Sequence, residues 1–182
     1  VLTSQYLGAG RYGKMKTSVY TSLFTFWGLS MLLAIIGLVI NPWVLSVLKT
    51  PENIVNDALL YLQIYFLGLP FLFMYNILSA TFNALGKSKI PLYLLMCSSA
   101  LNVVLDLVFV CVFGWGVAGV AIATVIAQGL SAVAGLVILI RFLRTFEVEP
   151  EEKVSIYDTG MLLQSTKIAI PSIIQQSIVS IG

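Results

Sequence analysis

The sequence predicts an all-α protein, a polytopic bundle of transmembrane helices. Hydrophobic residues make up 59% of the 182 residues and charged residues only 10%, whereas an ordinary soluble domain carries about 25% charged residues. Four apolar stretches, residues 18–40, 58–83, 90–113 and 116–142, are long enough to cross about 30 Å of hydrocarbon as helices. A fifth begins near Lys167. The chain starts without a methionine and ends inside an apolar run, so we expect a piece of a longer protein.

Helix-breaking residues separate these stretches. Asn41-Pro42 is expected to end the first helix, and Thr50-Pro51-Glu52 to begin the second, with Thr50 as N-cap and Pro51 in the first helical position. Gly86 is expected to cap the C-terminus of the second helix. Ile90-Pro91 should open the third helix, and Gly114-Trp115-Gly116 should connect the third and fourth tightly.

Lysine and arginine fall almost entirely on one side of the predicted bundle. With alternating spans, Lys49 alone lies on the opposite side. The other nine are Arg11, Lys14, Lys16, Lys87, Lys89, Arg141, Arg144, Lys153 and Lys167. The positive-inside rule makes the basic side cytoplasmic. We therefore expect a multi-pass protein of the cell membrane (plasma or inner), with residues 10–17, 86–90 and 141–167 in the cytoplasm.

Residues 143–166 form the longest polar stretch of the sequence. A connection of this length suggests a boundary between two structural units, residues 1–142 and 167–182. We expect the stretch to be a cytoplasmic linker with solvated acidic residues. These are Glu147, Glu149, Glu151, Glu152 and Asp158.

Asp106 is the only acidic residue within the four apolar stretches. Inserting a carboxyl group into the middle of a transmembrane helix costs about 2.5–3.5 kcal/mol on insertion scales, and carboxylates inside the membrane usually have a functional role. Ser98, Asn102 and Asp106 recur every four residues, so they share one helix face. Because burial disfavours the ionised form, Asp106 is expected to bind and release a proton. Alternatively, Asp106 and Asn102 with a hydroxyl could hold Na⁺, or Asp106 could only fix helix packing.

Two other stretches carry features that bear on this face. The second stretch has a polar face that includes Asn76 and Ser79, and Pro70 at its middle predicts a kink, either a gating hinge or a proline that packing tolerates. The fourth has a ribbon of small residues for close helix contact: Gly119, Ala123, Ala127, Ser131 and Gly135. Thr124 and Gln128 lie beside that ribbon. We expect a substrate cavity lined by Ser99, Asn76, Ser79 and Gln128.

Four motifs together resemble the multidrug and toxic compound extrusion (MATE) transporters. They are Ser4-Gln5-Tyr6-Leu7-Gly8-Ala9-Gly10, Asn83-Ala84-Leu85-Gly86-Lys87-Ser88-Lys89-Ile90-Pro91, Leu101-Asn102-Val103-Val104-Leu105-Asp106 and the run from Gly116 to Gln128. The resemblance implies twelve helices in two lobes. This chain would hold most of the N-terminal lobe, from the end of helix 2 to the start of helix 7.

The resemblance also implies an ion-coupling site. Asn102 and Asp106 match the family's Asn-x-x-x-Asp pair, and Thr124 matches its threonine. Tyr61 matches its tyrosine by position. The acidic residue that family members carry on their first helix lies outside this chain. The ion can therefore be H⁺ or Na⁺, and no other metal or cofactor is expected.

These observations predict a secondary active antiporter that exports organic, often cationic, compounds or drugs in exchange for H⁺ or Na⁺. A flippase for lipid-linked precursors is the alternative, but it would need Arg or Lys inside the cavity to hold a pyrophosphate, and the span interiors have none. An enzyme is not expected, because the spans contain no histidine and no paired carboxylates. The expected partners are a small organic substrate and the lipid bilayer, not nucleic acid, with the full-length chain working as a monomer.

Overall fold

The computed structural model describes residues 2–51, 54–150 and 152–181. Within these ranges the chain forms helices and connections and no strand, which confirms the all-α prediction. The helices are α1 (Leu2–Gly8), α2 (Tyr12–Val47), α3 (Val55–Ala84), α4 (Lys89–Leu107), the π-helical η1 (Val108–Val112), α5 (Gly116–Arg144) and α6 (Thr159–Ile181).

Four of these helices are long and apolar enough to cross a membrane. They are α2, α3, α4 together with η1, and α5, with 36, 30, 24 and 29 residues. Many of their large apolar side chains face outward; Val39 is 74% exposed and Val112 is 72% exposed. An apolar exterior of this kind is suited to contact with lipid and with further helices, so the four predicted spans are confirmed by length and composition.

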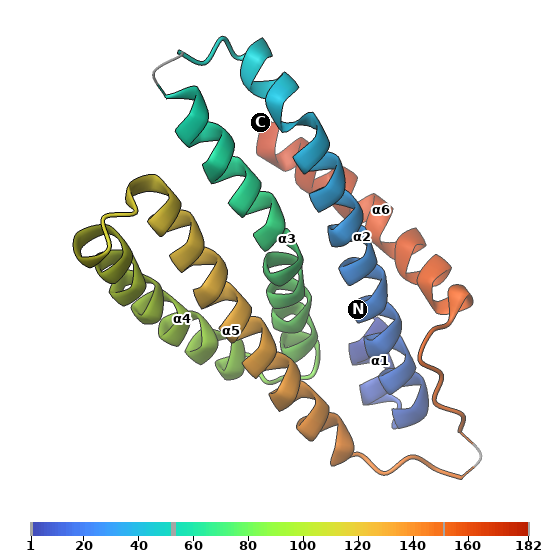
Figure 1. The fold of residues 1–182 in the computed structure, drawn as a ribbon. Helices are drawn as coiled ribbons and strands as arrows, with labels where there is room; N and C mark the ends of the chain where they lie inside the picture. The colour runs from blue at the N-terminus through green and yellow to red at the C-terminus, as the bar shows by residue number, and fades with distance from the viewer. Residues whose placement is uncertain (1, 52–53, 151, 182) are drawn as a thin grey trace.

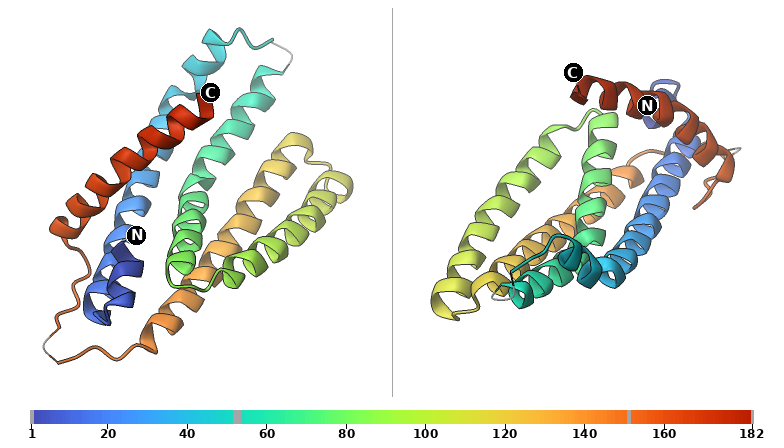
Figure 2. Two further views of the ribbon diagram at one scale, coloured as in Figure 1. Left: turned by 180° about the vertical axis from the view of Figure 1, so that it is seen from behind. Right: turned by 90° about the horizontal axis from the view of Figure 1, so that it is seen from above.

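The helices form two pairs with α3 between them (Figures 1 and 2). On one side α4 and α5 make an antiparallel hairpin, and on the other α6 lies along α2 in the same direction. α3 packs against both α2 and α5. A buried core lies where α2, α3 and α5 converge; its largest side chains are Met15, Leu78, Phe82, Leu139 and Leu143.

The prediction that Asn41-Pro42 ends the first helix is wrong, because α2 continues through Pro42 to Val47. Pro42 has no N–H to donate to the preceding turn, which weakens the helix at that point. The buried side chain of Asn41 donates from Nδ2 to the Leu59 carbonyl of α3 (3.2 Å). This contact fixes the weakened turn of α2 against its neighbour, and packing of this kind allows proline inside membrane helices.

The prediction that Thr50 caps the next helix is also wrong. α3 begins at Val55 with Ile54 in the N-cap position, and Glu52 lies outside the described residues. Thr50 instead completes the end of α2, where its N–H donates to Leu45 O (3.2 Å) and the Lys49 N–H donates to Ser46 O (3.1 Å). This is a Schellman motif, with Lys49 in the left-handed conformation (φ 51°) that usually selects glycine.

The predicted roles of Gly86 and of Gly114-Trp115-Gly116 are confirmed. Gly86 has φ 71° and follows α3, and the Lys87 N–H donates to Phe82 O (2.8 Å), so α3 ends in the same motif as α2. Gly114 and Gly116 have φ 69° and 52° at the connection into α5. α6 begins at Thr159, eight residues before the predicted start near Lys167. The division of the chain into two units stays a prediction.

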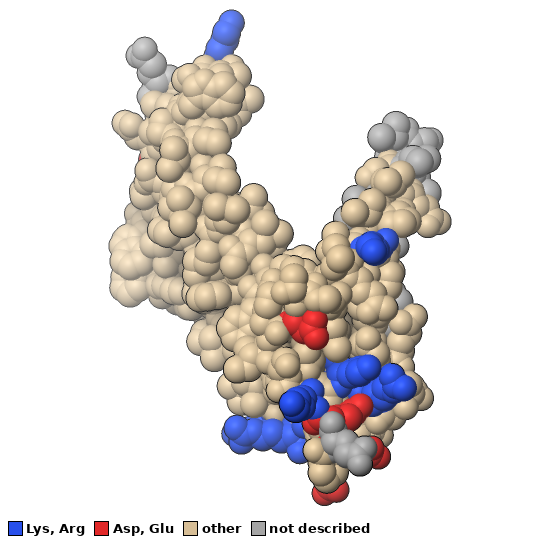
Figure 3. Space-filling model, turned by 90° about the vertical axis from the view of Figure 1, so that its right-hand side faces the viewer, with Lys and Arg blue, Asp and Glu red and all other residues tan. Residues whose placement is uncertain are grey.

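The charged residues are distributed unevenly along the bundle (Figure 3). Because the helices alternate in direction, the start of α2, the connection from α3 to α4 and the end of α5 share one end of the molecule. We call this the basic end, since Arg11, Lys14, Lys87, Lys89 and Arg144 lie there. Lys49 follows α2 at the opposite end. The distribution has the form that the positive-inside rule requires.

The five residues of the predicted ribbon on α5 are all buried: Gly119, Ala123, Ala127, Ser131 and Gly135. A Cβ atom at Gly135 would lie 3.1 Å from Leu94 Cδ1 of α4 and 3.2 Å from Leu78 Cδ1 of α3. Gly68 of α3 shows a closer approach, because a Cβ atom there would lie 2.6 Å from Val125 Cγ2 of α5. Small residues at these positions therefore let α3 and α4 lie close against α5.

We expect Gly68→Ala to destabilise the protein by about 1–3 kcal/mol, the usual effect of overpacking. Val125 is β-branched and stiff in a helix, so its Cγ2 atom cannot move aside freely. The measurement is the thermal unfolding midpoint in detergent. Val125→Ala should restore the stability of Gly68→Ala. Gly28→Ala should not destabilise, because no described atom outside its own stretch of α2 lies within 4 Å of the added carbon. Equal stability of Gly68→Ala and Gly28→Ala would contradict the close approach.

Candidate functional site

Two serines join α4 to α5 by interhelical hydrogen bonds. Ser98 of α4 donates from Oγ to the Ala127 carbonyl of α5 (3.2 Å), and Ser131 of α5 donates from Oγ to the Leu94 carbonyl of α4 (3.4 Å). On each helix the donor and the acceptor are four residues apart, so the pair is reciprocal. Each hydroxyl finds an acceptor on the other helix, which fixes the height of α4 against α5.

Asn102 and Thr124 form the next contact along the interface between α4 and α5, which we call the seam. Asn102 donates from Nδ2 to Thr124 Oγ1 (3.4 Å), and Thr124 donates its own proton to Val120 O (3.0 Å). The threonine proton is therefore already committed, which leaves the oxygen free to accept from the amide. The structure thus brings together two of the four residues that the sequence assigned to ion coupling.

Asp106 lies one turn beyond Asn102, where the seam offers no further hydroxyl. Following the antiparallel register of these contacts, α5 presents Gly119 and Val120 near this height, and neither offers a side chain that can form a hydrogen bond. The Oδ1 atom of Asp106 is buried and has no hydrogen-bond partner among the described residues. Leaving a buried acceptor unpaired costs about 1–3 kcal/mol, and more for a charged group. A proton would remove the negative charge, and a bound cation would give the oxygen a partner, so either would lower that penalty.

The helix changes its geometry immediately after Asp106. α4 ends at Leu107 and continues as the π-helix η1 through Val112. π-Helical turns inside α-helices are rare and often mark functional sites. No local signal predicts this change, since Val108–Val112 is an unbroken apolar run.

Tyr61 lies near Thr124 but outside these hydrogen bonds. It lines a small cavity between α3 and α5 together with Tyr65, Thr124 and Gln128. The Tyr61 and Tyr65 rings stack with their centroids 6.4 Å apart. Among the described residues, the structure places Tyr61 beside the Asn102–Thr124 pair and not in direct hydrogen-bond contact with it.

A larger cavity of about 240 Å³ opens between α3, α4 and α5. Three of the four predicted cavity residues, Asn76, Ser99 and Gln128, line it, and so do Asn102 and Thr124. Ser79 does not line it within the described part of the chain. The described lining residues are uncharged and combine amide and hydroxyl side chains with apolar ones, among them Leu72 and Leu95.

Tyr75 also lines this cavity and was not predicted. Its hydroxyl donates to the Pro91 carbonyl of α4 (3.1 Å), which joins α3 to α4. In the sequence Tyr75 looks like one more aromatic residue of an apolar helix, although its position next to Asn76 was a usable signal.

Pro70 is buried in α3, which changes direction about halfway (Figure 1).

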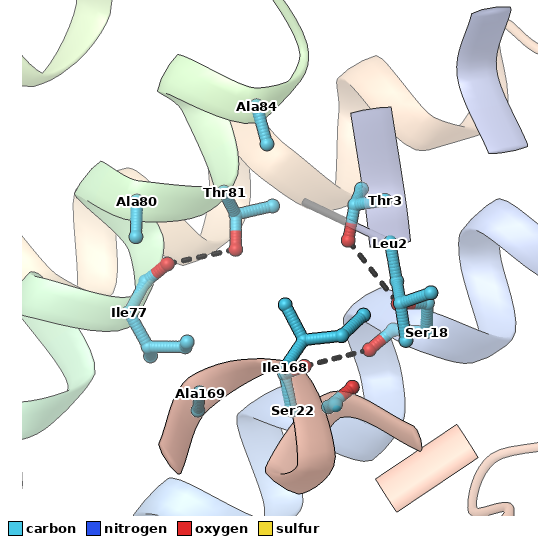
Figure 4. A pocket seen from close by; sticks show the side chains of 11 residues that line it. Leu2, Thr3, Ser18, Ser22, Ile77, Ala80, Thr81, Ala84, Ile168 and Ala169 are labelled. Atoms are coloured by element: carbon cyan, nitrogen blue, oxygen red, sulfur yellow. Dashed lines mark hydrogen bonds between the residues drawn. The ribbon is translucent and has the colours of Figure 1, made fainter. Parts of the chain in front are cut away.

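A second cavity, of about 330 Å³, lies between α1, α2, α3 and α6 (Figure 4). Hydroxyl groups of Thr3, Ser18, Ser22, Thr81 and Ser165 line it. Thr3 and Ser18 share a hydrogen bond (3.2 Å), Ser22 donates to Ser18 O (2.9 Å) and Thr81 donates to Ile77 O (2.7 Å). Most of these hydroxyls thus have partners within the protein, and the lining residues that the structure describes carry no formal charge.

Comparison with known proteins identifies the family. The sequence model of the family described as MatE matches residues 1–108. A probable multidrug resistance protein of Bacillus subtilis, YpnP, is 36% identical over 77% of this chain and 32% of its own length. Another from the same organism, YoeA, is 31% identical over 100% of this chain and 40% of its own length. The chain therefore spans about two fifths or less of these relatives.

A solved structure shares the fold. It is described as the inward-facing conformation of a multidrug resistance MATE family transporter, and it matches with a TM-score of 0.79 and 19% identity. The match covers 94% of this chain and 39% of the other. Because the family model matches more than half of the residues, this chain belongs to the multidrug and toxic compound extrusion (MATE) family.

Proposed function

We propose that the full-length protein is a secondary active antiporter that exports small organic compounds or drugs, many of them cationic, in exchange for H⁺ or Na⁺. Membership of the MATE family supports transport. The names of the relatives, which are multidrug resistance proteins, support the substrate class. Transport of this kind needs a site whose occupancy by the coupling ion changes the helix packing.

The unpaired carboxyl oxygen of Asp106 is the observation that carries the coupling proposal. It lies buried at the end of a polar seam and one turn from Asn102. A proton on Asp106 would neutralise the carboxyl group, and a Na⁺ ion held by Asp106 and Asn102 would give this oxygen a partner; release of either would restore the unpaired charge. Thr124 lines two cavities, so a change at Asp106 would alter the walls of both through the Asn102–Thr124 contact. Pro70 would serve as the hinge of α3.

The neutral lining of the larger cavity counts against the flippase alternative. None of the described residues that line it is charged, whereas a pyrophosphate would favour Arg or Lys as ligands. Amide and hydroxyl groups with one tyrosine suit an organic molecule that is neutral or singly positive. We place the protein in the cell membrane with its basic end, including residues 10–17, 86–90 and 141–167, in the cytoplasm.

Asp106→Asn should reduce coupled export to the background of empty vesicles, because the amide keeps the shape of the carboxyl group but cannot ionise. The measurement is uptake of a fluorescent organic cation by energised inside-out vesicles that contain the full-length protein. Asp57→Asn, on the exposed first turn of α3, is the matched control and should export normally. Wild-type export by Asp106→Asn would refute the proposed role of Asp106.

The coupling ion can be assigned with proteoliposomes that carry either a pH gradient alone or a Na⁺ gradient alone. The gradient of the coupling ion should drive uptake, and Asp106→Asn should abolish it. Uptake that neither gradient drives would contradict antiport coupled to these ions.

The contact between Asn102 and Thr124 gives a further prediction. Thr124→Val keeps the shape of the side chain but removes the oxygen that accepts from Asn102, so it should weaken both export and stability. Thr124→Ser keeps the oxygen and should stay close to wild type. A double-mutant cycle with Asn102→Ala should give a coupling energy of about 0.6 kcal/mol, the average for polar pairs in membrane proteins. Additive effects in thermal unfolding would show that the contact does not form.

A further inference from the structure

The connection between α5 and α6 lies against α2 (Figure 1). We call residues 146–158 the strap; residue 151 is outside the described chain. Lys16 Nζ donates to Phe146 O (2.8 Å), the Ser155 N–H donates to Thr17 Oγ1 (3.0 Å), and the Asp158 N–H donates to Thr21 Oγ1 (3.1 Å). These contacts join residues more than 120 positions apart in the sequence. Glu147 and Glu149 are exposed, as the prediction of a solvated linker requires, but the prediction is wrong for Glu152 and Asp158, whose carboxylates bind backbone N–H groups.

Glu152 of the strap caps the N-terminus of α2. The Gly13 N–H, in the first turn of α2, donates to Glu152 Oε2 (2.6 Å). The helix supplies no cap of its own, since the side chain of its N-cap residue, Arg11, forms no capping hydrogen bond. The first N–H groups of a helix lack partners within it, and a negative charge is favourable there. The strap thus supplies what α2 lacks.

Asp158 at the other end of the strap caps α6. Its Oδ1 accepts from the Met161 N–H (3.0 Å) and its carbonyl accepts from the Leu162 N–H (3.0 Å). The N–H of Asp158 meanwhile donates to Thr21 of α2. One segment therefore caps two helices that begin at the same end of the molecule and lie side by side.

Gly13 provides the space that the strap occupies. A Cβ atom on Gly13 would lie 2.8 Å from both Cβ and Oε2 of Glu152, and 3.2 Å from Val148 Cγ1. Gly13, Thr17 and Thr21 recur every four residues, so they form one face of α2. Alanine is a better helix former than glycine, so α2 itself does not require glycine at this position.

Aromatic packing fixes the beginning of the strap. The Phe146 ring lies 5.0 Å from the Tyr12 ring of α2 and 5.2 Å from the Phe142 ring of α5, measured between centroids. Contacts of this type add to the apolar area that the rings bury. The strap is thus held at its start by rings and along its length by hydrogen bonds.

We propose that residues 146–158 form a docked strap that holds the first turns of α2 and α6 together, so that these two helices move as one body at the basic end. This device goes beyond the proposed transport activity and does not depend on which ion or compound is carried. If the residues that follow the strap move relative to α2, that movement must then begin beyond the first turn of α6.

The test uses the full-length protein in nanodiscs and limited digestion with trypsin. Lys153 is exposed in the strap and is the only Lys or Arg between Arg144 and Lys167, so cleavage after it reports undocking. Gly13→Ala should accelerate this cleavage roughly tenfold, since cleavage follows the population of the open form and the variant displaces a charged hydrogen bond. Gly28→Ala, in open space on the same helix, should leave the rate unchanged. Equal rates for the two variants would overturn the proposal.

A second pair of variants covers the case in which Gly13→Ala fails to fold. Thr17→Val removes the acceptor for Ser155 without altering the cleaved segment, and it should also accelerate cleavage. Thr25→Val is the control, because Thr25 donates only within α2, to Thr21 O (2.7 Å). A cleavage rate in Thr17→Val no higher than in Thr25→Val would count against the strap.

Spin labels test whether the strap holds the two helices together. Cysteines at the exposed positions Lys14 and Thr159, in a full-length protein freed of Cys97, Cys111 and any further native cysteines, place one label on each helix. Pulsed electron–electron double resonance should give a narrow distribution of distances between the two labels, and this distribution should broaden in Gly13→Ala. A distribution that stays unchanged while cleavage accelerates would refute the coupled movement of α2 and α6.

Discussion

Polar groups in an apolar medium must find their partners within the protein, and the seam between α4 and α5 depends on this constraint. Hydrocarbon itself offers no hydrogen-bond partner to a hydroxyl or an amide. Ser98, Ser131 and Asn102 therefore bond to the facing helix. The same contacts fix the height of α4 against α5, so the position of Asp106 follows from the partners of the residues before it. Asp106 is the next polar residue of the seam, and its Oδ1 has no hydrogen-bond partner among the described residues.

The arrangement gives Thr124 a central place in the proposed coupling. Thr124 accepts from Asn102, donates to its own helix, and lines both cavities beside α3. A change of charge on Asp106 would act first on Asn102, which lies one turn away on the same face. Movement of the Asn102 amide would alter its contact with Thr124, and thereby the wall that the cavities share. The path is short, because each step is a contact between adjacent side chains or adjacent turns.

The sequence alone predicts features that depend on local spacing. The four spans, the Ser98–Asn102–Asp106 face, the small ribbon of α5 and the turn at Gly86 all follow from periodicity or from one residue type. The errors arise where tertiary contact overrides a local rule. Pro42 does not end α2, whose Asn41 is anchored to α3. Lys49, which follows α2, adopts a conformation that usually selects glycine. Tyr75 was missed because its partner, Pro91 O, belongs to another helix.

The strap is the clearest case of information that local sequence cannot carry. Five carboxylates between α5 and α6 have the composition of a solvated linker, and nothing in their spacing distinguishes Glu152 and Asp158 from the rest. Their roles become visible only when α2 lies beside them, because α2 offers an uncapped N-terminus, space at Gly13 and two threonine oxygens on one face. A charge at a helix N-terminus is favourable wherever in the sequence it originates. The acidic character of this connection therefore serves the packing of two helices as well as solubility.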